Sequence, residues 1–464
     1  MRKFTFVALA AMLSACVPTA DTQVTKGRPP APAGTEASEP ALAFVANPAF
    51  ATAPSSAGRG NAAIAADFMD LTFLMESGRA LPNFSRFEST VTVAMTGTVP
   101  GTARDEMTRL IRRFRTEAGI DMRFAGPGEK ASITVYFGPR AELRRLAPSA
   151  ACFVVPNVTS TADYKAKRGT AAADWTNVVQ RQQVGIFVPA EASPQEIRDC
   201  LNEETAQAMG PLNDLYRLPD SVFNDDNFHS VLTPFDMLVL RAYYSPELRS
   251  GMSRETVAAK IPGIINRLNP AGIGKGGTGD TSISTKAWKS AIETALGAGA
   301  GQGTRRAAAD RALMIARAQG WTDGRLAFSH FAIARLYVGS DRTLAVSEFT
   351  RAAEIYRRLP GADVQVAHIE MQLSAIALAN GQPQTALTLA DRAIPVVRRA
   401  QNYAMLATTQ LIKAEALDAL GRSAEASALR VDSQQWARYG FGSDAQVRAR
   451  TREISALGAR GSRG

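Results

Sequence analysis

The fold of this chain is decided by the segment 203–214, which reads Glu203-Glu204-Thr205-Ala206-Gln207-Ala208-Met209-Gly210-Pro211-Leu212-Asn213-Asp214. The segment has the pattern of a helix end, because Gly210 stops the helix. Residues four apart share a helix face, so Glu203 and Gln207 are expected to point the same way. Asn213 and Asp214 follow in the turn. The segment therefore predicts a helix and a turn that present several polar side chains together.

The helix is expected to begin after Ser193, since Pro194 suits the first helical position and Glu196 can bond back to the cap. The surrounding residues mix the periods of strands and helices. We expect strands at 90–95, 132–137 and 184–188, and further helices at 102–117 and 253–268. This order predicts an α+β domain over residues 62–268 with a mixed sheet.

The segment resembles the metzincin signature H-E-x-x-H-x-x-G-x-x-H-D. Its spacing agrees at every landmark, and Glu204, Gly210 and Asp214 stand at matching positions. The three histidine ligands do not match, because these positions hold Glu203, Gln207 and Asn213.

Two downstream motifs extend the resemblance. Ser221-Val222-Phe223-Asn224 is similar to the metzincin turn S-[VI]-M-[NH], with Phe223 in place of the methionine. The helix pattern that follows begins at Leu232 and includes Asp236. The resemblance implies a metzincin-like fold with Ser221, Phe223 and Asp236 in supporting positions. The domain also resembles an uncharacterised family of secreted bacterial proteins with a Glu-Glu-x-x-Gln helix, which implies no established activity.

The side chains at the ligand positions do not suit zinc. A catalytic zinc site takes mainly imidazole ligands, and of the chain's three histidines only His229 lies in this domain. Oxygen donors suit Ca²⁺ or Mg²⁺ better, so a bound hard cation is one alternative. We expect instead no metal and no cofactor, with Glu203, Gln207 and Asn213 in a hydrogen-bond network. Glu204 is the catalytic candidate in the other alternative, an unorthodox hydrolase of peptide or cell-wall material.

The N-terminus has the features of a lipoprotein signal peptide over residues 1–15. Arg2 and Lys3 precede a short apolar run, and Leu13-Ser14-Ala15-Cys16 resembles the lipobox of bacterial lipoproteins. We expect lipid on Cys16 to hold the protein to a membrane. Position 17 is Val rather than Asp, which by the sorting rule of such lipoproteins favours the periplasmic side of the outer membrane. Residues 16–61 are rich in Ala, Pro and Ser and predict a disordered tether.

Export also bears on the other two cysteines. In an oxidising compartment we expect Cys152 and Cys200 to form a disulfide, with two buried free thiols as the alternative.

The second half of the chain is expected to be helical. Residues 269–303 contain two glycine-rich runs and are predicted to be a linker. Residues 304–440 contain similar alanine-rich pieces that end at Gly339, Gly381 and Gly421, a spacing that resembles tetratricopeptide-type repeats. A helical bundle without true repeats is the alternative. Residues 441–464 are predicted to be a basic tail.

The formal net charge of +10 does not indicate nucleic acid as a partner, because no basic run is interleaved with aromatic residues. Stacked helical pairs usually offer a concave surface to another protein. The sequence therefore favours a lipid-anchored periplasmic interaction protein, a pseudo-metzincin with a protein partner on its helical repeats.

Overall fold

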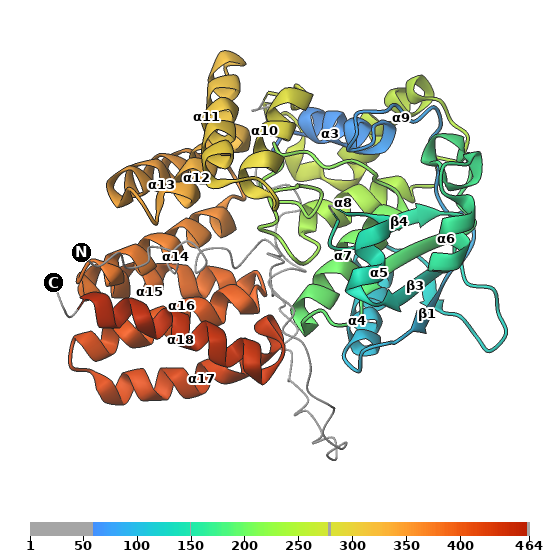
Figure 1. Cartoon of the computed structure of the whole chain (residues 1–464). Coiled ribbons are helices and arrows are strands. Elements are labelled where there is room, and N and C mark those ends of the chain that lie inside the picture. Colours follow the sequence, from blue (N-terminus) through green and yellow to red (C-terminus); the bar gives the residue numbers. More distant parts are fainter. Residues whose placement is uncertain (1–58, 149, 277–279, 462–464) are drawn as a thin grey trace.

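The computed structural model describes residues 59–148, 150–276 and 280–461, which form an α/β region followed by an all-helical region (Figure 1). The predicted signal peptide 1–15, the lipidated Cys16 and nearly all of the tether 16–61 lie outside the described residues. Within the described residues, no helix is both long and apolar enough to cross a membrane.

A five-stranded sheet forms the centre of the α/β region, in the order β2-β1-β3-β5-β4. The strands are β1 Val91–Gly97, β2 Met122–Phe124, β3 Ile133–Gly138, β4 Phe153–Pro156 and β5 Val184–Pro189. Neighbouring strands are parallel except β4, which runs antiparallel to β5 at the edge of the sheet. The prediction of a mixed sheet is confirmed. The sequence pattern does not indicate β2 and β4, because strands of three and four residues are too short to show an alternation.

Helices cover both faces of this sheet. α4 Ala103–Glu117 and α7 Pro194–Met209 pack beside each other on one face. Successive side chains of β5 point to opposite faces of the sheet. Ile186 packs in one core with Leu201 of α7, whereas Phe187 packs with Leu143 on the other face. The remaining elements of the region are α3 Asn61–Phe73, α5 Arg140–Leu146, α6 Thr161–Lys167, α8 Pro234–Tyr243, α9 Arg254–Leu268 and 3-10 turns at Ala171–Ala173, Trp175–Asn177 and Pro270–Gly272.

Cys152 and Cys200 form a disulfide, with 5.9 Å between their Cα atoms. Cys152 precedes β4 and Cys200 lies on α7. The bridge therefore joins the edge of the sheet to the helix that ends in the segment 203–214.

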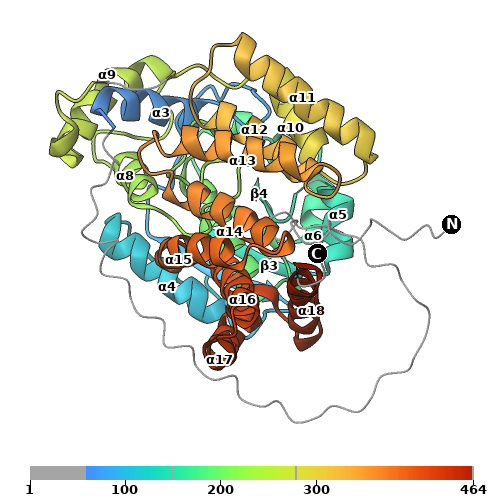
Figure 2. The same cartoon turned by 90° about the vertical axis from the view of Figure 1, so that its left-hand side faces the viewer.

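The all-helical region is built from consecutive helices that pack as pairs, and the pairs stack on one another (Figures 1 and 2). Its helices are α10 Lys286–Leu296, α11 Gln302–Ala318, α12 Gly324–Tyr337, α13 Arg342–Tyr356, α14 Asp363–Ala379, α15 Pro383–Arg399, α16 Tyr403–Ala419, α17 Ser423–Phe441 and α18 Asp444–Gly461. Gly381 and Gly421 adopt φ of 71° and 76° in the turns inside two pairs, where the left-handed region favours glycine. The prediction of a helical, repeat-like region is confirmed.

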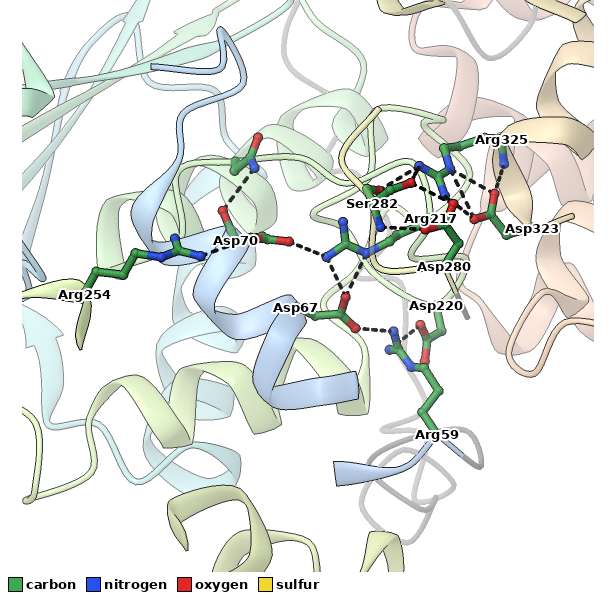
Figure 3. Close-up of polar contacts among 11 residues, drawn as sticks. Arg59, Asp67, Asp70, Arg217, Asp220, Arg254, Asp280, Ser282, Asp323 and Arg325 are labelled. Atoms are coloured by element: carbon green, nitrogen blue, oxygen red, sulfur yellow. Dashed lines mark hydrogen bonds and ion pairs between the residues drawn. The ribbon is translucent and has the colours of Figure 1, made fainter. Parts of the chain in front are cut away.

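The structure differs from the predicted linker 269–303, because this stretch contains α10. Trp288 of α10 is fully buried in the core of the helical region. Before α10, Asp280 and the backbone oxygen of Ser282 accept hydrogen bonds from Arg325 of α12, at 3.0 and 2.7 Å (Figure 3). Between the two glycine-rich runs lies a short apolar stripe with helical spacing, formed by Trp288, Ala291, Ile292 and Ala295.

The structure also differs from the predicted basic tail 441–464, because residues 444–461 form the helix α18. Ile454 and Leu457 are buried, and the helix packs against α14 and α16. These two apolar residues, three positions apart, fix one face of α18 to the helical pairs even though the composition is basic.

The two regions are packed against each other. The ring of Phe228, in the long loop between α7 and α8, lies 5.3 Å from Phe331 of α12 and 4.9 Å from His368 of α14, centroid to centroid. Gln365 of α14 donates a hydrogen bond of 2.7 Å to the backbone oxygen of Pro219 in the same loop. The faces of α12 and α14 are thus used by the chain itself.

A second contact joins α7 to α16. Gln195 donates to the side-chain oxygen of Asn402 at 3.1 Å, and Arg198 donates to the backbone oxygen of Gln401 at 2.9 Å. Both residues on α7 are buried. The helix that ends in the segment 203–214 is therefore held by both regions.

Candidate functional site

The start of α7 is formed as the sequence predicts. The Ser193 hydroxyl accepts a hydrogen bond from the backbone of Glu196, and the Glu196 carboxylate accepts one from the backbone of Ser193, at 3.2 and 2.8 Å. This reciprocal cap satisfies two of the free N–H groups at the helix start. It fixes the position of α7 and hence of the side chains at its far end.

The far end of α7 is closed by Gly210 and Arg181. A Cβ at Gly210 would lie 2.6 Å from the ring of Tyr243, so only glycine allows the chain to turn this close to α8. The buried guanidinium of Arg181 donates to the backbone oxygens of Gln207, Ala208 and Gly210 at 2.6, 2.7 and 2.5 Å. These contacts satisfy carbonyls that a helix end leaves free. Nothing near Arg181 in the sequence indicates this role.

The predicted supporting residues come together below α7. Asp236 is fully buried, and it accepts hydrogen bonds from the Ser221 hydroxyl at 2.5 Å and from the backbone of Val222 and Thr233 at 3.2 and 2.7 Å. Burial raises the pKa of Asp236 to about 6, while these hydrogen bonds oppose the rise. Phe223 is fully buried in the core. The turn and the following helix thus form one structural unit.

The three ligand positions do not form one network, which differs from our expectation for Glu203, Gln207 and Asn213. The amide of Gln207 lowers the pKa of Glu76, in the loop after α3. Asn213 instead donates to the backbone oxygen of Asp70 at 3.1 Å. Glu203 is half-buried and belongs to a group of carboxyls rather than to a triplet. The turn after Gly210 separates the side chains that the signature alone brings together.

Five carboxyl groups influence one another's pKa near the end of α7, and we call them the acidic cluster; they belong to Glu76, Glu203, Glu204, Asp214 and Asp225. Burial, then the charges of Asp225 and Glu76, raises the pKa of Glu203 to about 8. Burial followed by neighbouring carboxylates also raises the pKa of Glu204 and of Asp214 well above the usual range. The pKa values of Glu76 and Asp225 are raised as well, by burial of their carboxyl groups first. Burial and the neighbouring like charges therefore favour the protonated forms of these carboxyl groups.

Glu76 and Asp214 influence each other's pKa. Their interaction raises the pKa of Asp214, whereas it opposes the rise in the pKa of Glu76. The amide of Gln207 also lowers the pKa of Glu76, so Glu76 is coupled to both side chains. Sequence reasoning missed Glu76 and Asp225, since neither belongs to a motif.

Several buried oxygen atoms of the site accept no hydrogen bond from the described residues. They are Oε2 of Glu204, Oδ1 of Asp214 and Oδ1 of Asn213, in side chains that are 5%, 3% and 2% exposed. Buried acceptors without a partner are rare in folded proteins and require an explanation.

Two residues form the edge of the acidic cluster toward the helical region. The hydroxyl of Tyr216 donates to Asp225 at 3.2 Å, and its ring lies against Trp288 of α10 at 4.8 Å. Lys289 of α10 donates to the backbone oxygen of Glu76 at 3.2 Å. The acidic cluster thus lies where the two regions of the chain meet.

The side chains do not fit the zinc that the metzincin resemblance implies. Glu203 holds a proton at neutral pH, and the amide of Asn213 is directed to the backbone of Asp70. Among the described residues, no three His, Cys, Asp or Glu side chains are arranged to hold a metal ion. No reaction step through a metal can be built on this donor set.

Ser221 and His229 do not form a nucleophile and base pair. The Ser221 hydroxyl donates to Asp236, whereas Nε2 of His229 bonds to the backbone oxygen of Pro219 at 2.8 Å. Both residues have structural partners in the turn.

An ion-pair network holds the loop after α7 to α3 (Figure 3). Arg59 pairs with Asp67 and Asp220 at 3.1 and 2.7 Å, and Arg217 pairs with Asp67 and Asp70 at 2.9 and 2.8 Å. Burial raises the pKa of Asp67, and the two arginines oppose the rise. The network fixes the loop that follows Asp214 to α3.

Comparison with known proteins adds one finding. No curated protein and no solved structure matches the chain. Residues 61–263, which contain α3 to α8, most of α9 and the whole acidic cluster, match a family described as "Protein of unknown function (DUF2927)".

Proposed function

We propose that this protein is a lipid-anchored periplasmic protein of the outer membrane that binds a protein partner and does not hydrolyse it. The anchor rests on the lipobox-like sequence that ends at Cys16. The α/β region has the spacing of a metzincin domain with altered ligands, and the helical region resembles tetratricopeptide-type repeats.

The observation that carries the proposal is the position of Glu204. A general base must reach its substrate or a bound water. Glu204 is 5% exposed, and its Oε2 is buried without a partner. Burial, then the charge of Glu203, raises the pKa of Glu204 well above its usual range, which disfavours the charged form that a general base needs. These properties favour binding over a hydrolase that uses Glu204.

The helical region offers its outer faces to a partner. α12 and α14 contact Phe228, and Gln365 of α14 also contacts Pro219. These helix faces are therefore occupied by the chain itself. Exposed apolar side chains remain at Met314 on α11 and Val431 on α17, which are 62% and 69% exposed. We therefore place the partner on the outer helices rather than on the concave surface that the repeats suggested.

Site-specific photo-crosslinking in living cells tests this proposal. A photo-reactive residue at Met314 or Val431 should give discrete crosslinked species. The matched control is Val179, which is 53% exposed but lies in the α/β region. Equal crosslinking at all three positions, or none at Met314 and Val431, contradicts a partner on the helical region.

Two further measurements test the anchor and the absence of hydrolysis. Cys16→Ser should move the protein from the membrane fraction to the soluble fraction, because lipidation requires the thiol. Purified protein should degrade neither casein nor peptidoglycan, and Glu204→Ala should change nothing in either assay. Turnover that disappears in Glu204→Ala would establish the hydrolase instead.

A further inference from the structure

The last helix, α18, departs from the packing of the other helices in its region. Elsewhere consecutive helices form the pairs, as α14 does with α15 and α16 with α17. α18 packs instead against α14 and α16, the first helices of two pairs, and less against α17, which precedes it (Figure 2). It therefore lies across the stack of pairs and covers part of one side of it.

A sharp turn and a cap of its own define the start of α18. Gly442 adopts φ of 94° and ψ of −122°, which glycine takes readily, so the chain can reverse after α17. Ser443 then caps the helix. Its hydroxyl accepts from the backbone of Gln446 at 3.4 Å, and Oε1 of Gln446 accepts from the backbone of Ser443 at 2.8 Å. With 18 residues and its own cap, α18 is long enough to keep helical structure away from the stack.

Few side chains hold α18 in place. Of its described side chains, Ile454 and Leu457 are the buried ones. The hydroxyl of Ser455 donates to the carboxylate of Glu415 on α16 at 2.9 Å. By contrast, α16 is buried along most of its length. Segments with few buried apolar contacts open at a fraction of the free energy of global unfolding, so α18 should open before α14 and α16.

The surface beneath α18, formed by α14 and α16, is called the covered face. Ile454 and Leu457 belong to the same apolar core as the buried side chains of α14 and α16. Opening of α18 would therefore expose apolar surface, and such surface marks places where another chain binds. Glu415 also accepts from Arg430 of α17 at 2.8 Å, so its carboxylate keeps a partner when Ser455 leaves.

The pattern of α18 indicates which kind of segment the covered face accepts. Val447, Ile454 and Leu457 share one side of the helix, because they are spaced by whole turns within about 80°. The exposed Arg448 and Arg452 lie on the opposite side. α18 is thus an amphipathic helix, and a helix of another protein with this pattern meets the same apolar face.

We propose that α18 is a displaceable cover, and that the covered face binds an amphipathic helix of the protein partner in its place. The inference rests on the proposed function, to which it adds a second contact face and the kind of segment that binds there. Met314 and Val431 are exposed while α18 is docked, so the first contact with the partner does not require its displacement.

A labelled peptide with the sequence of residues 443–461 tests the covered face, by fluorescence anisotropy on the mature chain with Cys16→Ser. In this chain α18 occupies the face, so the peptide should bind weakly. Ile454→Asp combined with Leu457→Asp in the protein, the release variant, should strengthen binding about tenfold or more. Ala445→Asp at an exposed position of α18 is the matched control and should leave peptide binding unchanged. A peptide with the two substitutions of the release variant should not bind.

Hydrogen exchange of the wild-type chain measures the opening of α18 without any substitution, and it applies even if the release variant does not fold. The amides of α18 should exchange about tenfold or more faster than those of α14 and α16, because α18 opens on its own. Equal exchange in the three helices would make α18 an integral part of the stack and would overturn the inference.

Photo-crosslinking tests for the partner at the covered face. A photo-reactive residue in place of Glu415 should crosslink more strongly in the release variant than in the wild type, and peptide 443–461 added to isolated envelopes should suppress the product. The inference is overturned if the release variant binds no peptide, or if no crosslink at this position yields to the peptide. Binding of the release variant to phosphatidylglycerol vesicles without peptide binding would overturn it too, since α18 would then serve a lipid surface. Crosslinking at Met314 and Val431 does not need α18 to leave, so failure here leaves the proposed function standing.

Discussion

Asp236 and Asp214 are both buried carboxyl groups beside the end of α7, but their surroundings differ. Asp236 accepts three hydrogen bonds from Ser221, Val222 and Thr233. Asp214 has its pKa raised by burial and by the carboxyl group of Glu76, and its Oδ1 has no partner among the described residues. The comparison separates two uses of a buried acid. The turn around Ser221 is organised for stability, whereas the acidic cluster contains buried oxygen acceptors without a partner among the described residues.

The largest loss of stability should come from removal of the disulfide, which, like Asp236, has a structural role. Cys152 and Cys200 close a loop with a sequence separation of 48. The loop-entropy model gives such a bridge ~4 kcal/mol. Replacing both cysteines by Ala should lower the free energy of unfolding by about this amount in urea denaturation. Thiol labelling of the denatured, unreduced protein is the control, and labelled thiols there would show that no bridge exists.

The second effect is the loss of the Asp236 carboxyl. Asp236→Ala leaves three buried donors without an acceptor, so we expect a loss of about 3 kcal/mol of stability. Asp214→Ala removes a carboxyl that is itself poorly satisfied and should cost clearly less. Paired urea denaturation curves measure both. Equal losses of stability in the two variants would contradict the distinction between a carboxyl group that is fully hydrogen-bonded and one that is not.

The helices and strands could be predicted where local chemistry decides them. Ser193, Pro194 and Glu196 form the cap of α7 that their order indicates. The turn residues Ser221 and Asp236 also meet as the spacing suggests. Such features depend on neighbours in the chain or on a motif of fixed spacing, so one sequence contains enough information to place them.

The acidic cluster could not be predicted, because its members meet only through the tertiary fold. Glu76 is coupled to Asp214 and Gln207 from a loop that contains no motif. Likewise Arg181 donates to the last carbonyl groups of α7 from a distant loop, and its neighbours in the sequence do not indicate this contact. The same limit explains α10, since Trp288 looks like part of a glycine-rich linker until its partners on α12 are known.

A third, smaller effect concerns Gln207, a buried side chain of α7 whose amide lowers the pKa of Glu76. Gln207→Ala should cost about 1 kcal/mol, because it removes a buried amide while Glu76 is an exposed residue that water can solvate. Chelators should leave the melting temperature of the wild-type protein unchanged. A melting temperature several degrees lower in EDTA would place a bound cation at this site.

The smallest effect should be a gain in stability and not a loss. The pKa of Glu203 is about 8 in the folded chain, above its ordinary value of 4.5, so the folded state holds the proton more tightly than the unfolded state. Its contribution to stability is therefore complete at low pH and is lost as the pH rises from about 4.5 to 8. Glu203→Gln cannot ionise, so it should match the wild type near pH 5 and exceed it by about 1 kcal/mol near pH 8.5. Thermal unfolding at both pH values measures the difference. A variant that is less stable at both would make Glu203 a structural acid like Asp236.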